Sequence, residues 1–211
     1  METLECIETR RSVRKFLDIP VEFDKVGNIL NAGRLAPSAG NLQDWKFVLV
    51  TELNLLKELS EACTHQHWMA KAPVHIVICS KASETDRMYG KRGRELFSVQ
   101  NCAAAAQNML LAAHDQGLGA CFVSAFEDHM VRRTLSMPDD VRPMVVIPIG
   151  YPDETPKQPT KHNIDNVTYI ERWGNRIKDF AAYVGYYSHH IAHAALIGKE
   201  KLRQFLEKWS K

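Results

Sequence analysis

The stretch FSVQNCAAAAQNMLLAAHDQGLG, residues 97–119, decides the fold. Alanines and aliphatic residues occupy most positions around this predicted helix, and Gly117 and Gly119 end it. A helix that is apolar on most sides must be covered by other elements, so residues 97–116 are expected to run through the centre of a domain. The rest of the chain is therefore expected to pack around this helix.

Strands and further helices are interspersed on both sides of the central helix. Strand patterns occupy residues 45–51, 73–79, 120–123 and 143–150, and helical patterns occupy residues 25–34, 53–63 and 127–137. Asp24 is expected to cap the first of these helices. The polar, glycine-punctuated residues 81–96 are expected to form a long surface excursion. Because no regular βαβ rhythm is present, the pattern favours an α+β or mixed-sheet α/β fold over a doubly wound one.

Charge and composition exclude several classes of protein. The 211 residues hold 27 Lys and Arg against 25 Asp and Glu, a net charge of +2, which is too small for a nucleic-acid binder. No apolar run approaches the roughly 20 residues that span a membrane, and the first residues lack the apolar core of a signal peptide. We therefore expect a cytoplasmic protein. The odd number of cysteines without a CxxC motif predicts buried thiols in a reducing compartment: Cys6, Cys63, Cys79, Cys102 and Cys121.

The segment TRRSVRKF, residues 9–16, gathers four cations in a nearly neutral chain. An extended path would place Arg10, Ser12 and Arg14 on one side of the backbone. Two guanidinium groups with a hydroxyl between them suit a phosphate monoester, because each can donate two charge-assisted hydrogen bonds. A solvated basic loop with partial ion pairs is the alternative, and the spacing alone leaves both open.

Two segments of small and polar residues are candidate ligand contacts. PSAGNLQDW, residues 37–45, offers backbone donors, a hydroxyl and the amides of Asn41 and Gln43, which could bind the polar edge of a heterocycle. It could equally be a capping turn. After the central helix, small residues at Ser124 and Ala125 would let backbone amides approach a flat ligand, although helix termination alone also accounts for that segment.

Other signatures are missing from the sequence. It has no GxGxxG after a strand, no Walker A loop and no GxSxG elbow. His189 and His193 lie four residues apart beside His190, but they lack a third ligand type. His65 and His67 likewise give no indication of a metal site from the sequence. No metal site is predicted from the sequence.

Four segments, in this order and spacing, resemble the nitroreductase family of FMN-dependent oxidoreductases. They are RRSVRKF, APSAGNLQDW, AAAAQNMLLAAHDQGLG, and PIGYP before a basic stretch that ends in IERWG. The resemblance covers residues 4–174. It implies an α+β fold with a mixed, mainly antiparallel sheet flanked by helices, and an obligate homodimer with FMN at the subunit interface.

The resemblance also implies particular FMN contacts. The phosphate and ribityl contacts would come from Arg10, Arg11, Ser12 and Arg14, with Lys161 completing the phosphate site. A loop of the partner subunit would contribute Pro37, Ser38, Ala39 and Asn41, and Gln43 would shape that loop. Backbone at Ser124 and Ala125 would lie against the flavin ring.

The activity implied is hydride transfer from NADH or NADPH to a small acceptor by a ping-pong cycle without a catalytic side chain. The acceptor would be a nitroaromatic, a quinone or a flavin. A non-redox flavin- or nucleotide-binding module is an alternative. A specialised family reaction, such as flavin fragmentation or reductive dehalogenation, is another, with residues 80–95 lining the pocket.

The chain departs from the family pattern at several places. Asp44 stands where the family usually has proline, Asn101 stands where an acidic residue is common, and Lys161 with His162 replaces the usual arginine-containing stretch. Residues 175–211 are expected to form a helical extension of the 1–174 domain, with a break near Gly198. Their aromatic stripes are expected to pack on the dimer close to the pocket.

Overall fold

A computed structural model describes residues 1–177, 179, 182–185 and 188 of the chain. The chain divides into two compact units, residues 1–158 and residues 159–211. The first unit contains α1 (Thr3–Thr9), α2 (Phe23–Arg34), η1 (Ala39–Asn41), β1 (Trp45–Val50), α3 (Leu53–Ala62), η2 (His67–Lys71), β2 (Val74–Lys81), α4 (Ala82–Arg92), η3 (Gly93–Phe97), α5 (Ser98–Asp115), β3 (Gly119–Ala120), α6 (Asp128–Thr134) and β4 (Val141–Gly150). In the second unit the described elements include the short helix α7 (Ile164–Val167).

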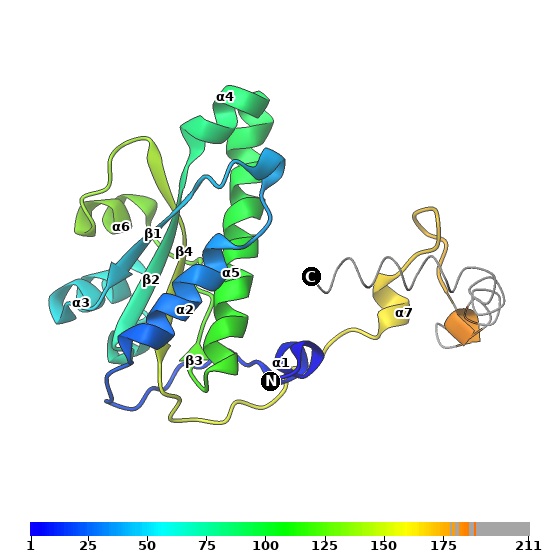
Figure 1. Ribbon diagram of the computed structural model, residues 1–211, viewed down its shortest axis with the longest axis horizontal. Coiled ribbons are helices and arrows are strands. Elements are labelled where there is room, and N and C mark those ends of the chain that lie inside the picture. The colour runs from blue at the N-terminus through cyan, green and yellow to red at the C-terminus, as the bar shows by residue number, and fades with distance from the viewer. Residues whose placement is uncertain (178, 180–181, 186–187, 189–211) are drawn as a thin grey trace, which may run out of the picture. The chain divides into compact units, whose positions relative to one another are not determined.

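The strands of the first unit form one sheet in the order β1-β2-β4-β3, and all three strand pairs are antiparallel. A single parallel bridge, between Ser12 and Ala120, adds the N-terminal segment to the edge. Strands β1, β2 and β4 and the helices around them follow the sequence patterns closely (Figure 1). The predicted α+β fold with a mainly antiparallel sheet is confirmed.

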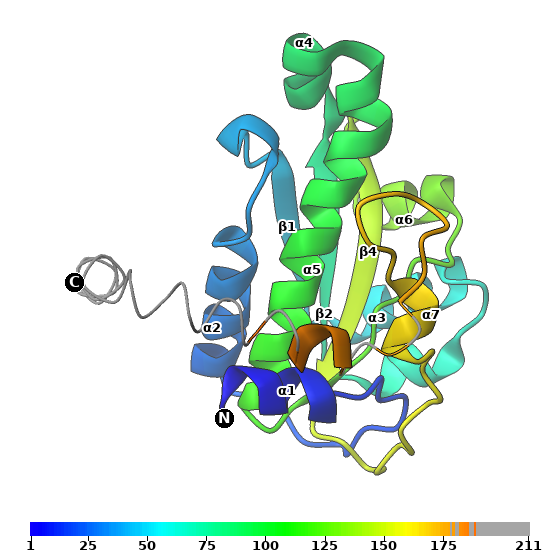
Figure 2. The same cartoon turned by 90° about the vertical axis from the view of Figure 1, so that its right-hand side faces the viewer.

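Both faces of the sheet are covered, which makes three layers (Figures 1 and 2). On β2, Ile76 and Ile78 pack with α2 and α5, whereas Val77 and Cys79 pack with α3, η2 and α6 on the other face. This alternation follows from the two-residue period of a strand. Helix α5 buries Cys102, Ala105, Ala106, Met109, Leu110 and Ala113, as expected of the central helix.

Three local predictions were wrong. Helix α2 begins at Phe23, so Asp24 lies within its first turn and Glu22 takes the capping position. The Glu22 carboxylate accepts a hydrogen bond from the Tyr151 hydroxyl instead of capping the helix. The strand expected at residues 120–123 is reduced to Gly119–Ala120 and an isolated bridge at Val123.

The third correction concerns residues 81–96: the segment is largely exposed, as expected of a surface excursion, but it is helical (α4 and η3). Gly90 takes φ +58° and absorbs a kink inside the helical segment. Tyr89 packs edge-on against Phe97, with ring centroids 5.2 Å apart. Gly90 therefore introduces a kink, and the helical segment continues beyond it into η3.

Most of the predicted C-terminal extension lies outside the described residues, including its second stripe and the expected break near Gly198. The division of the chain after Gly174 remains a prediction. Among the described residues, no helix is long and apolar enough to cross a membrane. All five cysteines are buried free thiols, as the sequence predicted.

His75 fixes η2 to the sheet from a fully buried position on β2. Its Nε2 lies 2.9 Å from the carbonyl oxygen of Met69, and its Nδ1 has no partner. Burial lowers the pKa of His75 to about 4, against the opposing effect of that hydrogen bond. The ring is therefore neutral in the folded protein at neutral pH.

This burial predicts a pH-dependent stability. Between pH 6.5 and about 4 the unfolded chain binds a proton at His75 that the folded chain does not, so the free energy of unfolding decreases as the pH falls. His75→Gln, which keeps an N–H donor but does not titrate, should flatten this decrease by about 3 kcal/mol. Urea unfolding of both proteins at several pH values and one protein concentration measures the difference. Identical pH dependences would contradict the buried neutral ring.

Candidate functional site

Residues 10–17, which contain all four cations of the TRRSVRKF stretch and are called the basic segment below, are extended and lie along the edge of the sheet. Val13 donates its backbone N–H to Ala120, with N and O 3.1 Å apart, and Leu17 donates to Tyr151 at 2.9 Å. A Cβ on Gly119 would lie 2.8 Å from a methyl carbon of Val13, so only glycine permits this close approach. The extended path predicted from the sequence is confirmed.

Arg10, Ser12 and Arg14 all influence the buried thiol of Cys121. Burial raises the pKa of the Cys121 thiol, whereas the charges of Arg14 and Arg10 and a hydrogen bond with Ser12 act to lower it. All three side chains therefore act on one buried thiol from the same stretch of backbone. The alternation of an extended chain accounts for this grouping.

The cations of this segment have no carboxylate partner among the described residues. No Asp or Glu oxygen lies within ion-pair distance of Arg10, Arg11, Arg14 or Lys15 in that part of the chain. The nearby Glu154 carboxylate instead accepts the backbone N–H groups of Arg14 and Lys15, at 2.6 and 3.1 Å. Within the described residues, these four cations are therefore not neutralised by ion pairs.

Aromatic and backbone contacts orient two of the arginines. The guanidinium carbon of Arg14 lies 5.9 Å from the ring centroid of Trp68, which itself stacks on Phe16. The guanidinium group of Arg11 donates to the carbonyl oxygens of Glu8 and Arg10. The Arg11 guanidinium group therefore donates to its own backbone, whereas that of Arg14 donates no hydrogen bond within the described part of the chain.

Residues 37–43, called the PSAGN loop below, form a turn that contains three residues with left-handed backbone. Gly40, Asn41 and Gln43 have φ values of +55°, +56° and +52°. The backbone N–H of Gln43 donates to the Ser38 hydroxyl, and the Gln43 side-chain amide donates to the carbonyl and side-chain oxygens of Asn41. Gln43 thus holds the turn, and the side chains of Pro37 and Asn41 are exposed.

A buried polar network anchors this loop to the sheet and to α5. The Asp44 carboxyl group, which is fully buried, accepts hydrogen bonds from the Ser80 hydroxyl at 2.5 Å and the Asn101 amide at 2.6 Å. The Asn101 side-chain oxygen in turn accepts the backbone N–H of Ala39 at 2.9 Å. The two departures from the family pattern, Asp44 and Asn101, are therefore direct partners.

Helix α4 packs against the same loop. A Cβ on Gly40 would lie 2.4 Å from the Tyr89 hydroxyl, so a larger residue at this left-handed position would have to displace the Tyr89 side chain. Helix α4 thus borders the candidate site through Tyr89.

Ser124 and Ala125 are exposed and follow directly after the bridge between Val123 and Val146. The Gln66 side-chain amide donates to the Ala125 carbonyl oxygen at 3.5 Å, and Glu127 donates its N–H to Ala62. The turn is therefore tied to the end of α3. Both it and the basic segment flank Cys121.

The candidate residues form two groups at opposite ends of α5. The PSAGN loop binds Asn101 near the start of the helix, and Thr9, just before the basic segment, contacts His114 near its end at 2.8 Å. At 1.5 Å per residue these two anchors are about 20 Å apart along the helix axis. Figure 1 shows the segment between α2 and β1 near one end of α5 and α1 near the other.

Lys161 is exposed in the second unit, so its part in a phosphate site remains a prediction.

Trp68, Glu154 and Asp44 support the site but were not identified as its members from the sequence. Glu154 meets Arg14 across 140 positions of the chain, and Trp68 lies on η2, far from Arg14 in sequence. Only the departure from the family's proline marked Asp44 as unusual. No local pattern signals contacts of this range.

A groove of about 590 Å³ runs between α2 and β1 beside the PSAGN loop. It is lined by Gly27, Leu30, Asn31, Arg34, Trp45, Lys46, Phe47 and Leu49. Leu35, at the end of α2 and before the loop, is 64% exposed. The groove is thus lined by both apolar and polar side chains of α2 and β1.

Comparison with known proteins points to the same family as the sequence motifs. The family model described as "Nitroreductase family" matches residues 7–67 and 63–151. A Methanothermobacter thermautotrophicus protein named "Putative NADH dehydrogenase/NAD(P)H nitroreductase" is 37% identical over 177 residues, covering 82% of this chain and 88% of its own. A solved structure of the same description, from Parabacteroides distasonis, is 32% identical with a TM-score of 0.72 and covers 81% of this chain and 98% of its own. The NADPH-flavin oxidoreductase of Vibrio harveyi is 27% identical over 162 residues, covering 74% of this chain and 68% of its own.

The family match spans most of the first unit, including the basic segment, the PSAGN loop and all four strands. Together with the shared fold and the relative at 37% identity, it shows that this chain is an oxidoreductase belonging to the nitroreductase family.

Proposed function

We propose that the protein is an FMN-dependent enzyme that passes hydride from NADH or NADPH to a small acceptor. The observation that carries this proposal is the group of cations around Ser12, which have no carboxylate partner among the described residues. A phosphate dianion supplies the compensating charge, and the guanidinium groups of Arg10 and Arg14 match its oxygens.

The proposed FMN site is made by two subunits of a homodimer. A single subunit has its cations and its PSAGN loop at opposite ends of α5, about 20 Å apart along the axis. We infer that the cations of one subunit hold the phosphate, while Pro37, Ser38, Ala39 and Asn41 of the other contact the same cofactor. The groove between α2 and β1, with Leu30, Phe47 and Leu49 in its lining, supports a subunit contact there.

Bound FMN would supply the redox chemistry, accepting hydride from the nicotinamide and donating it to the acceptor. The chain's own contribution is binding and orientation. Arg10, Ser12 and Arg14 hold the phosphate, and Ser124 and Ala125 offer backbone against the ring. Asp44 and Asn101 keep the PSAGN loop in position. No side chain is assigned a proton-transfer role.

The acceptor we propose is a nitroaromatic, a quinone or a free flavin, because an open face of the flavin ring discriminates weakly between acceptors that stack on it. A specialised reaction on the same fold, such as flavin fragmentation or reductive dehalogenation, is the alternative, and Tyr89 of α4 beside Gly40 would then border the acceptor. We further propose a cytoplasmic location, which the five buried free thiols support.

The phosphate assignment predicts the behaviour of arginine variants. Arg10→Ala or Arg14→Ala should weaken FMN binding by about 2–3 kcal/mol, because a buried dianion loses a charge-assisted partner. Lysine at either position should weaken FMN binding less than alanine does, but measurably, because its ammonium group cannot donate two parallel hydrogen bonds as a guanidinium group can. Fluorescence titration of the apoprotein with FMN measures both effects.

Arg142→Ala is the matched control, because Arg142 is also exposed but pairs with Asp128 at 3.3 Å. Its FMN affinity should equal that of the original protein. Unchanged affinity in both Arg10→Ala and Arg14→Ala would mean that the phosphate binds elsewhere.

The proposed reaction predicts a spectral change without any acceptor. Anaerobic addition of NADH or NADPH to the yellow holoprotein should abolish the flavin absorbance near 450 nm, because hydride reaches the bound cofactor. Later addition of menadione or a nitroaromatic should restore it. A protein that binds FMN but is not reduced by either nucleotide would instead be a non-redox flavin-binding module.

A further inference from the structure

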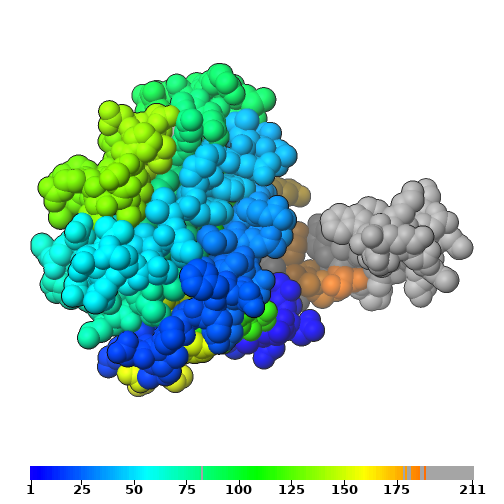
Figure 3. Space-filling view, turned by 60° about the vertical axis from the view of Figure 1, so that its left-hand side comes forward, coloured from blue at the N-terminus to red at the C-terminus, as the bar shows by residue number. Residues whose placement is uncertain are grey.

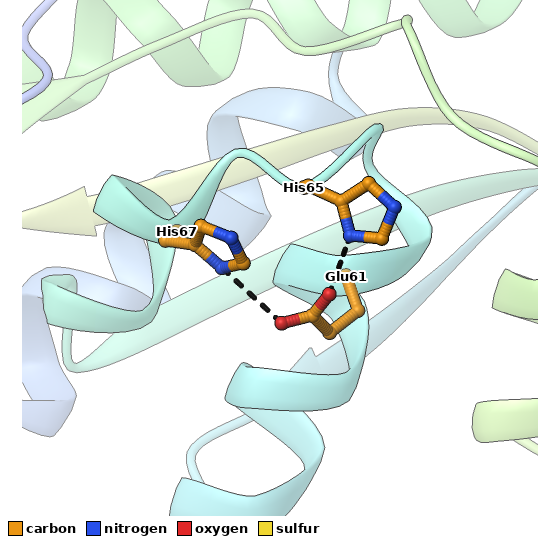
Figure 4. A group of neighbouring side chains, drawn as sticks. All are labelled: Glu61, His65 and His67. Atoms are coloured by element: carbon orange, nitrogen blue, oxygen red, sulfur yellow. Dashed lines mark hydrogen bonds and ion pairs between the residues drawn. The ribbon is translucent and has the colours of Figure 1, made fainter.

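We propose that Glu61, His65 and His67 bind one divalent transition-metal ion, such as Zn²⁺, at the C-terminal end of α3. The three side chains come from the last turn of α3, the following turn and the start of η2, and they point toward one another (Figure 4). This site is distinct from the FMN contacts proposed above. The sequence alone offered no third ligand for the two histidines.

The distances between the ligand atoms suit a small metal ion. His65 Nδ1 lies 2.6 Å from Glu61 Oε2, and His67 Nδ1 lies 3.2 Å from Glu61 Oε1. One ligand atom from each residue lies within 4.8 Å of the others. Metal bonds of about 2.0–2.2 Å need ligand atoms about 3–3.5 Å apart, so small side-chain rotations complete the geometry.

The backbone that carries the histidines is held in place by the fold. Thr64 and His65 both have left-handed backbone, with φ values of +55° and +56°, although neither is glycine. Hydrogen bonds compensate for this conformation: Ser60 Oγ donates to the Gln66 carbonyl oxygen at 2.7 Å, and Gln66 Nε2 donates to the Cys63 carbonyl oxygen at 2.9 Å. The turn therefore presents His65 above Glu61 before any metal arrives.

The next segment is fixed as well. His67 donates its N–H to the carbonyl oxygen of His65 at 2.9 Å, and buried His75 holds Met69 of the same short helix. Both imidazoles are thus anchored on rigid backbone, which lowers the entropy lost on coordination.

The ligand types select the metal. Two imidazoles and one carboxylate suit Zn²⁺, Ni²⁺, Co²⁺ or Cu²⁺ better than Mg²⁺ or Ca²⁺, which prefer oxygen ligands. The side chains of His65 and His67 are 73% and 69% exposed, which leaves room for water ligands. Figure 3 shows α3 and the turn after it, in cyan, at the surface.

Isothermal titration of the holoprotein with Zn²⁺ near pH 7.5 tests the site. One ion per subunit should bind, and Glu61→Gln, His65→Asn or His67→Ala should each weaken binding about tenfold or more. Asparagine is chosen at position 65 because it tolerates left-handed backbone. Unchanged circular dichroism of each variant will show that the fold is kept.

Two controls make the result specific. His129→Ala removes an exposed histidine that has one glutamate neighbour, Glu127 at 4.0 Å, but no partner histidine in the described part of the chain, and should leave the affinity unchanged. A triple replacement of His189, His190 and His193 should also leave it unchanged. Zinc binding that is absent, that persists in His65→Asn and His67→Ala, or that disappears with the triple replacement would overturn the proposal.

Discussion

The burial of α5 is the constraint on which the rest of this structure depends. Its alanines and aliphatic residues can leave water only if α2, the sheet and the N-terminal segment all pack around it. The same helix then acts as a spacer. The PSAGN loop binds Asn101 near its start, and Thr9 beside the basic segment contacts His114 near its end. One rigid element thus sets the distance between the two groups of proposed cofactor contacts.

The network around Asp44 shows how a departure from a family pattern can be accommodated. A buried carboxyl group is tolerated when its oxygens accept hydrogen bonds, and Ser80 and Asn101 provide them. Asn101 has both a donor and an acceptor, so it satisfies Asp44 and the backbone N–H of Ala39 at once. An aspartate at position 101 would place a second carboxyl group against Asp44. Asp44 and Asn101, the two departures from the family pattern, therefore depend on each other for their hydrogen bonds.

The sequence predicted most of the fold because hydrophobic periodicity reports which face of each element is buried. Strand β2 and helix α5 follow their patterns almost to the residue. The prediction failed at residues 81–96, where glycines were expected to break helical structure but instead permit a kink, with Tyr89 on Phe97. In the candidate site, the extended path of Arg10, Ser12 and Arg14 could be predicted from local alternation. The contributions of Trp68 and Glu154 could not, because those contacts join distant parts of the chain.

Mixed dimers can show whether each proposed FMN site takes its cations from one subunit and its loop from the other. Arg10→Ala/Arg14→Ala subunits and Ser38→Ala/Asn41→Gly subunits, carrying different tags, can be co-expressed and the mixed dimer purified. It would hold one site with both defects and one with neither. The account predicts weak FMN binding by each variant homodimer and one FMN per mixed dimer bound with the affinity of the original protein. Mixed dimers that bind FMN no more tightly than either homodimer would contradict it.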